Sequence, residues 1–169
     1  MEQVVLVNKS NRKLGTEEKL EAHKKGLLHR AFSVFVFNNK GELLLQKRHS
    51  SKYHSGGLWS NTVCSHPRPG ERYISAVHRR LHEEVGFDCP VKKIKPFIYR
   101  ADFDDGLIEN EYDVVFIGKY NGPIHPDPAE IETTKWISLS ALKDDILRNP
   151  QNYTFWFKKI IKMGIIKPF

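Results

Sequence analysis

One amphipathic helix set between strand-forming segments is the feature that most constrains how this chain can fold. From position 71 to 85 apolar residues recur at helical spacing, and these residues are Ile74, Val77, Leu81 and Val85. Residues at this spacing lie on one face of a helix, so other parts of the chain must cover that face. Gly86 follows and predicts the end of the helix, because glycine readily adopts the left-handed backbone found there. The pattern predicts an α+β fold in which strands cluster around a central helix.

Segments with strand character flank this helix on both sides. The run 31–37 is strongly β-prone, and the turn-forming residues 38–41 connect it to 42–48 in the pattern of a hairpin. We expect further strands in the first eight residues and at 58–63, 91–99, 107–120 and 131–139. Shorter helices are expected at 17–24, 140–147 and 153–163, the first of them capped by Thr16 and ended by Gly26.

The size and composition describe a single domain over residues 1–169. A chain of 169 residues, 40% of them hydrophobic, is long enough to bury a core and to hold a pocket inside it. No apolar run approaches the roughly 20 residues of a membrane span, and the N-terminus lacks the pattern of a signal peptide. The two cysteines, Cys64 and Cys89, are too few for a disulfide framework, so we expect a protein of the reducing cytoplasm.

The net charge of +7 narrows the class of ligand. A basic chain can bind nucleic acid, an anionic membrane or a phosphorylated substrate. The sequence contains no aromatic–basic RNA motif, helix-turn-helix or zinc finger, and its short lysine runs at 92–95 and 158–162 are typical of a solvated surface. We therefore expect a small anionic ligand, with neither nucleic acid nor a membrane as a partner.

Two carboxylates alternate within one predicted strand, at Glu109 and Glu111. Side chains of a strand repeat every second residue, so these two share a face, and burying them together is costly unless a cation or a proton relieves their repulsion. Taken singly, histidines are more often ordinary core or surface residues, and a free cysteine is usually a small buried hydrophobe. With His23, His29, Cys64 and His66 in the same chain, a metal is the favoured relief, and the pattern indicates an enzyme.

The segment 65–87 resembles the Nudix box, whose helix carboxylates bind magnesium and activate water in hydrolases. The matching residues are Glu71, Arg79, Leu81, Glu83, Glu84, Gly86 and Phe87. The chain departs from the box at two positions, with Ser65 in place of a glycine and Arg80 in place of a glutamate. Arg80 puts a fixed cation where a metal ligand belongs, which argues against hydrolysis of a pyrophosphate.

Three motifs together resemble the type I isopentenyl diphosphate isomerases, the metal-dependent and flavin-free enzymes built on the Nudix fold. They are Leu-Trp-Ser-Asn-Thr-Val-Cys-Ser-His-Pro at 58–67, Arg-Arg-Leu-His-Glu-Glu-Val-Gly at 79–86, and Tyr-Arg-Ala at 99–101 followed by Gly-Leu-Ile-Glu-Asn-Glu at 106–111. The resemblance extends from Glu18 to Trp156, most of the chain. The small departures, such as Ser60 in place of a threonine, remove no reactive group.

This resemblance implies a Nudix-like α/β/α sandwich with a mixed central sheet, and an enzyme of isoprenoid biosynthesis acting on a prenyl diphosphate. The implied reaction interconverts isopentenyl and dimethylallyl diphosphates by adding a proton to an alkene carbon and removing another from a neighbouring carbon. Cys64 and Glu111 would handle these protons on opposite faces of the substrate, and the sequence leaves open which one donates. Tyr99 would hydrogen-bond Glu111, and Trp156 would cover the pocket and stabilise a cation with its π face.

The same resemblance implies two metal sites and a set of cations for the diphosphate. A manganese or zinc ion would be bound by His23, His29, His66, Glu109 and Glu111. A magnesium ion held with Glu84 would bridge to the substrate diphosphate. The diphosphate itself would be bound by Lys19, Arg48, Lys52 and Arg80. The remaining histidines, His49, His54, His78, His82 and His125, receive no role, and we expect a monomer.

Two other functions fit parts of the sequence. A Nudix hydrolase of nucleoside or other diphosphates would fit the box, although Arg80 argues against it. A non-catalytic Nudix-fold binder, for example of nucleic acid, would fit the charge of +7. The complete set of cysteine, tyrosine, histidine and glutamate groups favours the isomerase over both.

Overall fold

Nine strands form one sheet in the described part of the chain, residues 2–52, 54–103 and 105–168 of a computed structural model. The strands are β1 (Gln3–Val7), β2 (Lys13–Glu18), β3 (His29–Phe37), β4 (Glu42–Arg48), β5 (Trp59–Ser60), β6 (Val63–Ser65), β7 (Val91–Asp102), β8 (Ile108–Lys119) and β9 (Ile131–Ser138). The helices are α1 (Lys19–Lys25), α2 (Tyr73–Val85), α3 (Leu139–Arg148) and α4 (Phe155–Lys162), with the 3-10 turn η1 (Pro150–Asn152) before the last. This content confirms the predicted α+β class.

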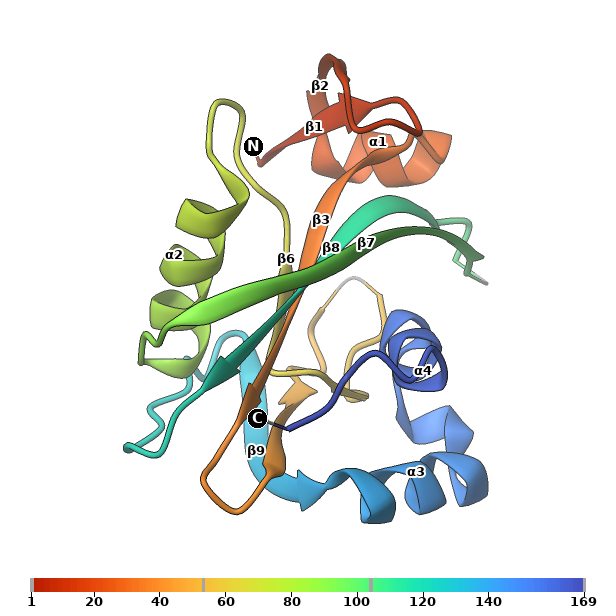
Figure 1. Cartoon of the computed structure of the whole chain (residues 1–169). Helices are drawn as coiled ribbons and strands as arrows, with labels where there is room; N and C mark the ends of the chain where they lie inside the picture. The colour runs from red at the N-terminus through yellow and green to blue at the C-terminus, as the bar shows by residue number, and fades with distance from the viewer. Residues whose placement is uncertain (1, 53, 104, 169) are drawn as a thin grey trace.

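Helices cover the sheet from two sides, which gives the predicted α/β/α sandwich (Figure 1). On one side, Val77 and Leu81 of α2 share a buried cluster with Phe32 of the central strand β3. On the other side, Phe157 of α4 packs near Phe35 of the same strand, with 6.0 Å between the ring centroids. Alternate residues of β3 therefore belong to opposite cores, as the two-residue period of a strand requires.

The sheet opens between β3 and β4. These two strands pair only at Phe37 and Leu43, after which β3 pairs with β6 and β8, and β4 pairs with β5 and β9. The Thr62 hydroxyl bridges the opening, because it accepts a hydrogen bond from the Val36 N–H (2.9 Å) and donates one to the Leu44 carbonyl (2.7 Å). Since β8 runs parallel to β3 and β6 antiparallel to it, the predicted mixed sheet is confirmed.

The N-terminal helix differs from its predicted bounds. Thr16 does not cap it, because residues 13–18 form β2, in which Thr16 pairs with Val5. The helix begins at Lys19, and the Glu18 side chain caps it by accepting a hydrogen bond from the Glu21 N–H. Gly26 ends the helix in the left-handed conformation (φ 61°), as predicted. Residues 17 and 18, expected in the first turn of the helix, therefore belong to strand β2, which the sequence pattern did not reveal.

Two other predicted elements are shorter than expected. The strand predicted at 58–63 is interrupted at Asn61 and Thr62, whose side chains bond to neighbouring backbone instead of extending a ladder. The C-terminal helix begins at Phe155 instead of 153, since the chain first makes the turn η1. Among the described residues, no helix combines the length and the apolar character that crossing a bilayer requires.

Candidate active site

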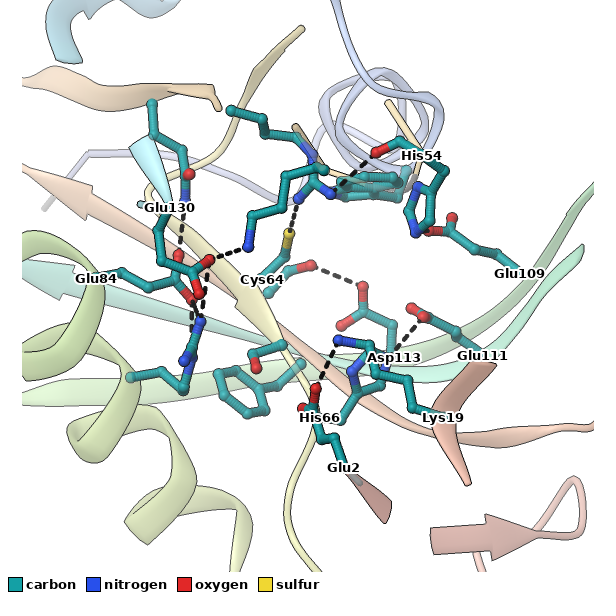
Figure 2. A pocket seen from close by; sticks show the side chains of 18 of the residues that line it. Glu2, Lys19, His54, Cys64, His66, Glu84, Glu109, Glu111, Asp113 and Glu130 are labelled. Atoms are coloured by element: carbon teal, nitrogen blue, oxygen red, sulfur yellow. Dashed lines mark hydrogen bonds and ion pairs between the residues drawn. The ribbon is translucent and has the colours of Figure 1, made fainter. Parts of the chain in front are cut away.

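A pocket lies where β3 and β4 separate, and all the predicted site residues except His23 and His29 line it. Figure 2 shows Cys64 near its centre, with Glu84 and Glu130 to one side and Glu109, Glu111 and Asp113 to the other. Gly26 explains where the two exceptions lie. Its left-handed turn leads from the end of α1 directly into β3, so His23 and His29 are both completely buried behind the pocket wall.

Three histidines converge on one oxygen of Glu111. The Glu111 Oε1 atom lies 3.0 Å from His66 Nε2, 3.5 Å from His29 Nε2 and 4.0 Å from His23 Nε2. His29 and Glu111 are directly paired across β3 and β8, which places two of these side chains side by side. The donor atoms of all four residues lie within 4.8 Å of one another. This spacing suits a single ion bound by three imidazoles and a carboxylate.

The backbone fixes how two of these rings are protonated. His23 Nδ1 lies 2.7 Å from the Lys19 carbonyl and His29 Nδ1 lies 2.7 Å from the Leu27 carbonyl. A carbonyl only accepts, so each Nδ1 carries the hydrogen and each Nε2 faces Glu111. Contact between such a nitrogen and a carboxylate oxygen needs a positive centre, either a second proton on the ring or a metal ion. The buried His29 Nε2 has no hydrogen-bond partner among the described residues, which fits a divalent metal.

Burial favours the neutral, metal-binding form of His23 and His66. Burial lowers the pKa of His66 to about 4. Burial and the neighbouring His29 side chain both lower the pKa of His23. Burial also opposes the ionisation of Glu111, but the neighbouring His29 and His66 side chains outweigh it and hold the pKa of Glu111 well below its usual range. The site therefore offers imidazole nitrogens and one ionised carboxylate, the donor set of a zinc or manganese centre.

Glu109 lies apart from these four donors. Its Oε1 atom is 3.3 Å from His54 Nε2, and it groups with His54 and His23 instead of with His29 and His66. The five-residue ligand set therefore stays a prediction, while four of its members are brought together. His54 was given no role from the sequence, because it stands in a loop outside every recognised motif. No spacing pattern in the sequence would have identified it.

The Tyr99 hydroxyl connects the two carboxylates. It lies 2.7 Å from Glu111 Oε2 and 3.0 Å from Glu109 Oε2. One hydroxyl hydrogen cannot serve both oxygens at once, so the three groups share their protons. Burial and the charge of Glu111 raise the pKa of Glu109 well above its usual range, and burial next to both carboxylates raises the pKa of Tyr99. Tyr99 thus keeps its proton and holds it against Glu111.

Cys64 and Trp156 lie on the other side of the pocket. Cys64 is paired with Ser33 across β6 and β3, and burial raises the pKa of its thiol to about 12 even though Arg48 Nη1 lies 3.9 Å from the sulfur. Trp156 is 3% exposed and its Nε1–H donates to Ser60 Oγ at 3.1 Å. The Arg48 guanidinium lies 5.3 Å from the Trp156 ring centroid. A protonated thiol and an anchored indole therefore line the same pocket.

The four predicted phosphate-binding cations also line the pocket, and three of them form ion pairs with carboxylates there. Arg80 Nη2 lies 2.6 Å from Glu84 Oε1 and 3.5 Å from Glu130 Oε2. Glu130 also pairs with Lys52. Lys19 Nζ lies 2.9 Å from Glu2 Oε2. Glu2 and Glu130 were not predicted, since isolated acids far from the motifs carry no signal of their own.

A third acid of β8 was missed. Asp113 follows Glu109 and Glu111 on the same face of the strand, is 1% exposed and lines the pocket. Ser33 Oγ donates to Asp113 Oδ2 at 2.7 Å, and burial together with the charge of Glu111 raises the pKa of Asp113 to about 8. The alternation that identified the first two acids continues to position 113, so the sequence did contain this signal.

Comparisons with known proteins agree with this geometry. The family model of the NUDIX domain matches residues 27–157. The chain is 53% identical to "Isopentenyl-diphosphate Delta-isomerase 2" of Photorhabdus laumondii over 94% of this chain and 89% of that protein. It is 47% identical to "Isopentenyl-diphosphate Delta-isomerase" of Burkholderia multivorans over 95% of this chain and 92% of that protein.

Solved structures show the same fold at low sequence identity. The DR0079 protein of Deinococcus radiodurans superposes with a TM-score of 0.80 at 16% identity, over 96% of this chain and 98% of that one. The MutT protein of Methanosarcina mazei superposes with a TM-score of 0.66 at 19% identity, over 80% of this chain and 91% of that one. The chain belongs to the Nudix family and, within it, to the isopentenyl-diphosphate Delta-isomerases.

Proposed function

We propose that this chain interconverts isopentenyl and dimethylallyl diphosphates and leaves the diphosphate intact. Its similarity to proteins named isopentenyl-diphosphate Delta-isomerase supports the substrate. The observation that carries the chemistry is the placement of Cys64 and Glu111 on the lining of one pocket. Cys64 holds its proton, because its pKa is raised to about 12, whereas Glu111 is ionised, because its pKa lies well below the usual range. Moving a double bond needs one group that gives a proton and one that takes a proton.

The proton-transfer side of the pocket consists of Glu111, Tyr99 and Glu109. The Tyr99 hydroxyl at 2.7 Å can pass a proton to Glu111, and the raised pKa of Glu109 makes it a reserve of protons beside Tyr99. Cys64 acts from across the pocket. Because the reaction is reversible, the group that donates in one direction accepts in the other.

The cationic character of the reaction sets the demands on the rest of the pocket. Protonating an alkene produces positive charge on carbon, and the face of Trp156 can stabilise such a charge by about 2 kcal/mol when water is excluded. Its hydrogen bond to Ser60 holds the ring in one orientation. Helix α4, which carries Trp156, keeps water away from the cation. Water that reached the cation would add to it and give an alcohol.

The metal centre consists of His23, His29, His66 and Glu111, with Glu109 beside it, and we assign it manganese or zinc. Such an ion, when bound, would supply positive charge that favours the ionised form of Glu111. Lys19, Arg48, Lys52 and Arg80 would bind the diphosphate, and Glu84 would hold the magnesium ion that accompanies it. The carboxylates now paired with three of these cations would have to yield to the substrate.

Hydrolysis is disfavoured at the Nudix helix itself. Arg80 occupies the position of a hydrolase carboxylate and donates through Nε and Nη2 to Glu84 Oε1, at 2.9 and 2.6 Å. The second oxygen of Glu84 accepts a hydrogen bond from Gln46 Nε2 at 3.0 Å. With an arginine at this position, the helix has one carboxylate fewer to bind the metal that activates water in a hydrolase.

We further propose a cytoplasmic location, since the free cysteines Cys64 and Cys89 suit a reducing compartment. We also propose that the chain is a monomer.

Phosphorus NMR on isopentenyl diphosphate and on a panel of nucleoside diphosphates tests the reaction type. An isomerase converts the first compound to its dimethylallyl isomer and releases no phosphate from any of them. Release of phosphate from any member of the panel, without isomerisation, would replace the proposal with a hydrolase.

A further inference from the structure

His54 is a buried histidine at the pocket for which the proposed reaction has no use. It lies in the loop between β4 and β5 and is 8% exposed. Its ring stacks on Phe103 with 5.2 Å between centroids, and it meets the edge of Trp156 at 6.0 Å. Burial, assisted by the charge of Arg48, lowers the pKa of His54 to about 3, so the ring is neutral at neutral pH. A polar ring buried among aromatic groups needs a specific polar contact.

The two ring nitrogens of His54 face different polar groups: Nδ1 lies 3.4 Å from Ser55 Oγ, and Nε2 faces Glu109. His54 Nε2 lies 3.3 Å from Glu109 Oε1, while the other oxygen of Glu109 lies 3.0 Å from the Tyr99 hydroxyl. Each oxygen of this carboxyl group is therefore next to a different polar group, and its orientation is fixed by two contacts instead of one. Figure 2 shows the His54 ring directed at Glu109.

Direct binding of the central ion by His54 is disfavoured by the way the donors are grouped. His54, Glu109 and His23 form one group of donor atoms, and His23, His29, His66 and Glu111 form another. The two groups share only His23, whose Nδ1 is engaged with the Lys19 carbonyl. The remaining Nε2 has one lone pair and can bind one ion. An ion in the four-residue group therefore leaves His54 to act through Glu109.

Arg48, a residue of the pocket, fixes the backbone of the loop that carries His54. Arg48 donates through Nη2 to the His54 carbonyl and through Nε to the Ser55 carbonyl, both at 3.2 Å. The same guanidinium reaches Cys64 and the face of Trp156. The backbone at His54 is thus fixed whether or not the imidazole is present. Removing the ring should change the contact with Glu109 and leave the loop in place.

We propose that His54 is a positioning residue of the metal centre, which directs the Glu109 carboxyl group toward the ion through a hydrogen bond from Nε2. This inference rests on the metal centre of the proposed function. Groups that orient a metal ligand typically change metal affinity by 10–100-fold when they are removed. Glu109 thus connects the loop after β4 to the site formed by His23, His29, His66 and Glu111.

The test is to titrate the metal-free full chain with Mn²⁺ and to measure the binding affinity by calorimetry. His54→Asn is too short to reach Glu109 and should weaken binding by about 10–100-fold. His54→Gln places an amide donor near the position of Nε2 and should bind Mn²⁺ within a few-fold of the wild type. His78→Ala, a partly exposed histidine of α2 paired with Asp88, is the matched control and should bind as tightly as the wild type. Unchanged melting of each metal-free variant shows that it is folded.

A double-substitution cycle separates positioning from direct binding. In a Glu109→Ala background, His54→Asn should cause no further loss of affinity, because the residue through which it acts is gone. An undiminished loss in that background would overturn the proposal, as would wild-type affinity for His54→Asn alone. Failure of the wild type to bind Mn²⁺ would instead refute the metal centre itself. The two kinds of failure are therefore distinguishable.

Discussion

Tyr99 and Glu111 are directly opposite each other on the antiparallel strands β7 and β8, and the Tyr99 hydroxyl lies 2.7 Å from Glu111 Oε2. The register of one strand pair thus places a proton donor against the carboxylate that three histidines also contact. A shift of this register by one residue would turn Tyr99 to the other face of the sheet.

Replacing Tyr99 by Phe should slow isomerisation while preserving the fold. The ring still fills its place, but the group that delivers a proton to Glu111 is lost, and such groups contribute about 10²–10⁴-fold. Steady-state kinetics with isopentenyl diphosphate should show the loss in kcat. Tyr112→Phe is the control and should keep full activity, because Tyr112 follows Glu111 on β8 and packs on the opposite face of the sheet. Wild-type kcat in Tyr99→Phe would remove Tyr99 from the proton path.

Replacing Cys64 by Ala should abolish turnover, whereas Cys89→Ala should not. Cys64 faces the substrate pocket, and Cys89 lies in the hydrophobic cluster on the α2 side of the sheet. Loss of a positioned proton-transfer group costs about 10²–10⁴-fold in rate. Thermal melting shows whether each variant is folded. A folded Cys64→Ala enzyme that still turned over would contradict the assigned role.

The pH dependence of alkylation reports the protonation of Cys64. Its pKa is raised from 9.0 to about 12, so the folded state holds the thiol proton across the neutral and mildly alkaline range. Only the thiolate reacts, so in Cys89→Ala protein the alkylation rate should keep rising from about pH 7 to about pH 10. An ordinary thiol with a pKa near 9 is half ionised at pH 9, so its rate would flatten towards pH 10, whereas a thiol with a pKa of about 12 gains nearly tenfold in rate for each pH unit. Flattening between pH 9 and pH 10 would show that the pocket does not suppress ionisation.

The ion pair of Arg80 and Glu84 should contribute to stability as well as to substrate binding. Glu84 is 3% exposed, so Arg80→Leu leaves a buried carboxylate without its cation and should cost about 3 kcal/mol in the free energy of unfolding. In a Glu84→Gln background the same change should cost less. Arg72→Leu, at an exposed position just before α2, should change stability by less than about 0.5 kcal/mol. Equal costs of Arg80→Leu in both backgrounds would refute the coupling, and urea denaturation measures it.

Local patterns predicted most of the elements, and long-range pairing accounts for most of what was missed. The apolar stripe of α2 and the strands on either side depend on neighbouring residues, so the sequence contains them. Strand β2 and the separation of β3 from β4 depend on pairing with distant segments. The bridge that Thr62 makes between Val36 and Leu44 is one such contact, and no periodic pattern in the sequence predicts it.

The site divides in the same way. Alternation identified Glu109 and Glu111. Gly26 ends the first helix as expected, and its turn brings His23 and His29 inward. Asp113 could have been found by continuing that alternation. His54 could not, because its role follows from a loop that brings it to Glu109 from 55 positions away in the chain (109 minus 54). A solitary loop histidine has no periodic neighbours with which to be compared.

The most direct test of the account is a proton NMR time course with isopentenyl diphosphate in heavy water, using metal-loaded enzyme with and without a chelator. We expect the metal-loaded enzyme to form dimethylallyl diphosphate that carries deuterium and to release no phosphate. We expect the chelator to abolish this conversion. Metal-loaded enzyme that forms no dimethylallyl isomer, or that cleaves the diphosphate, would contradict the account.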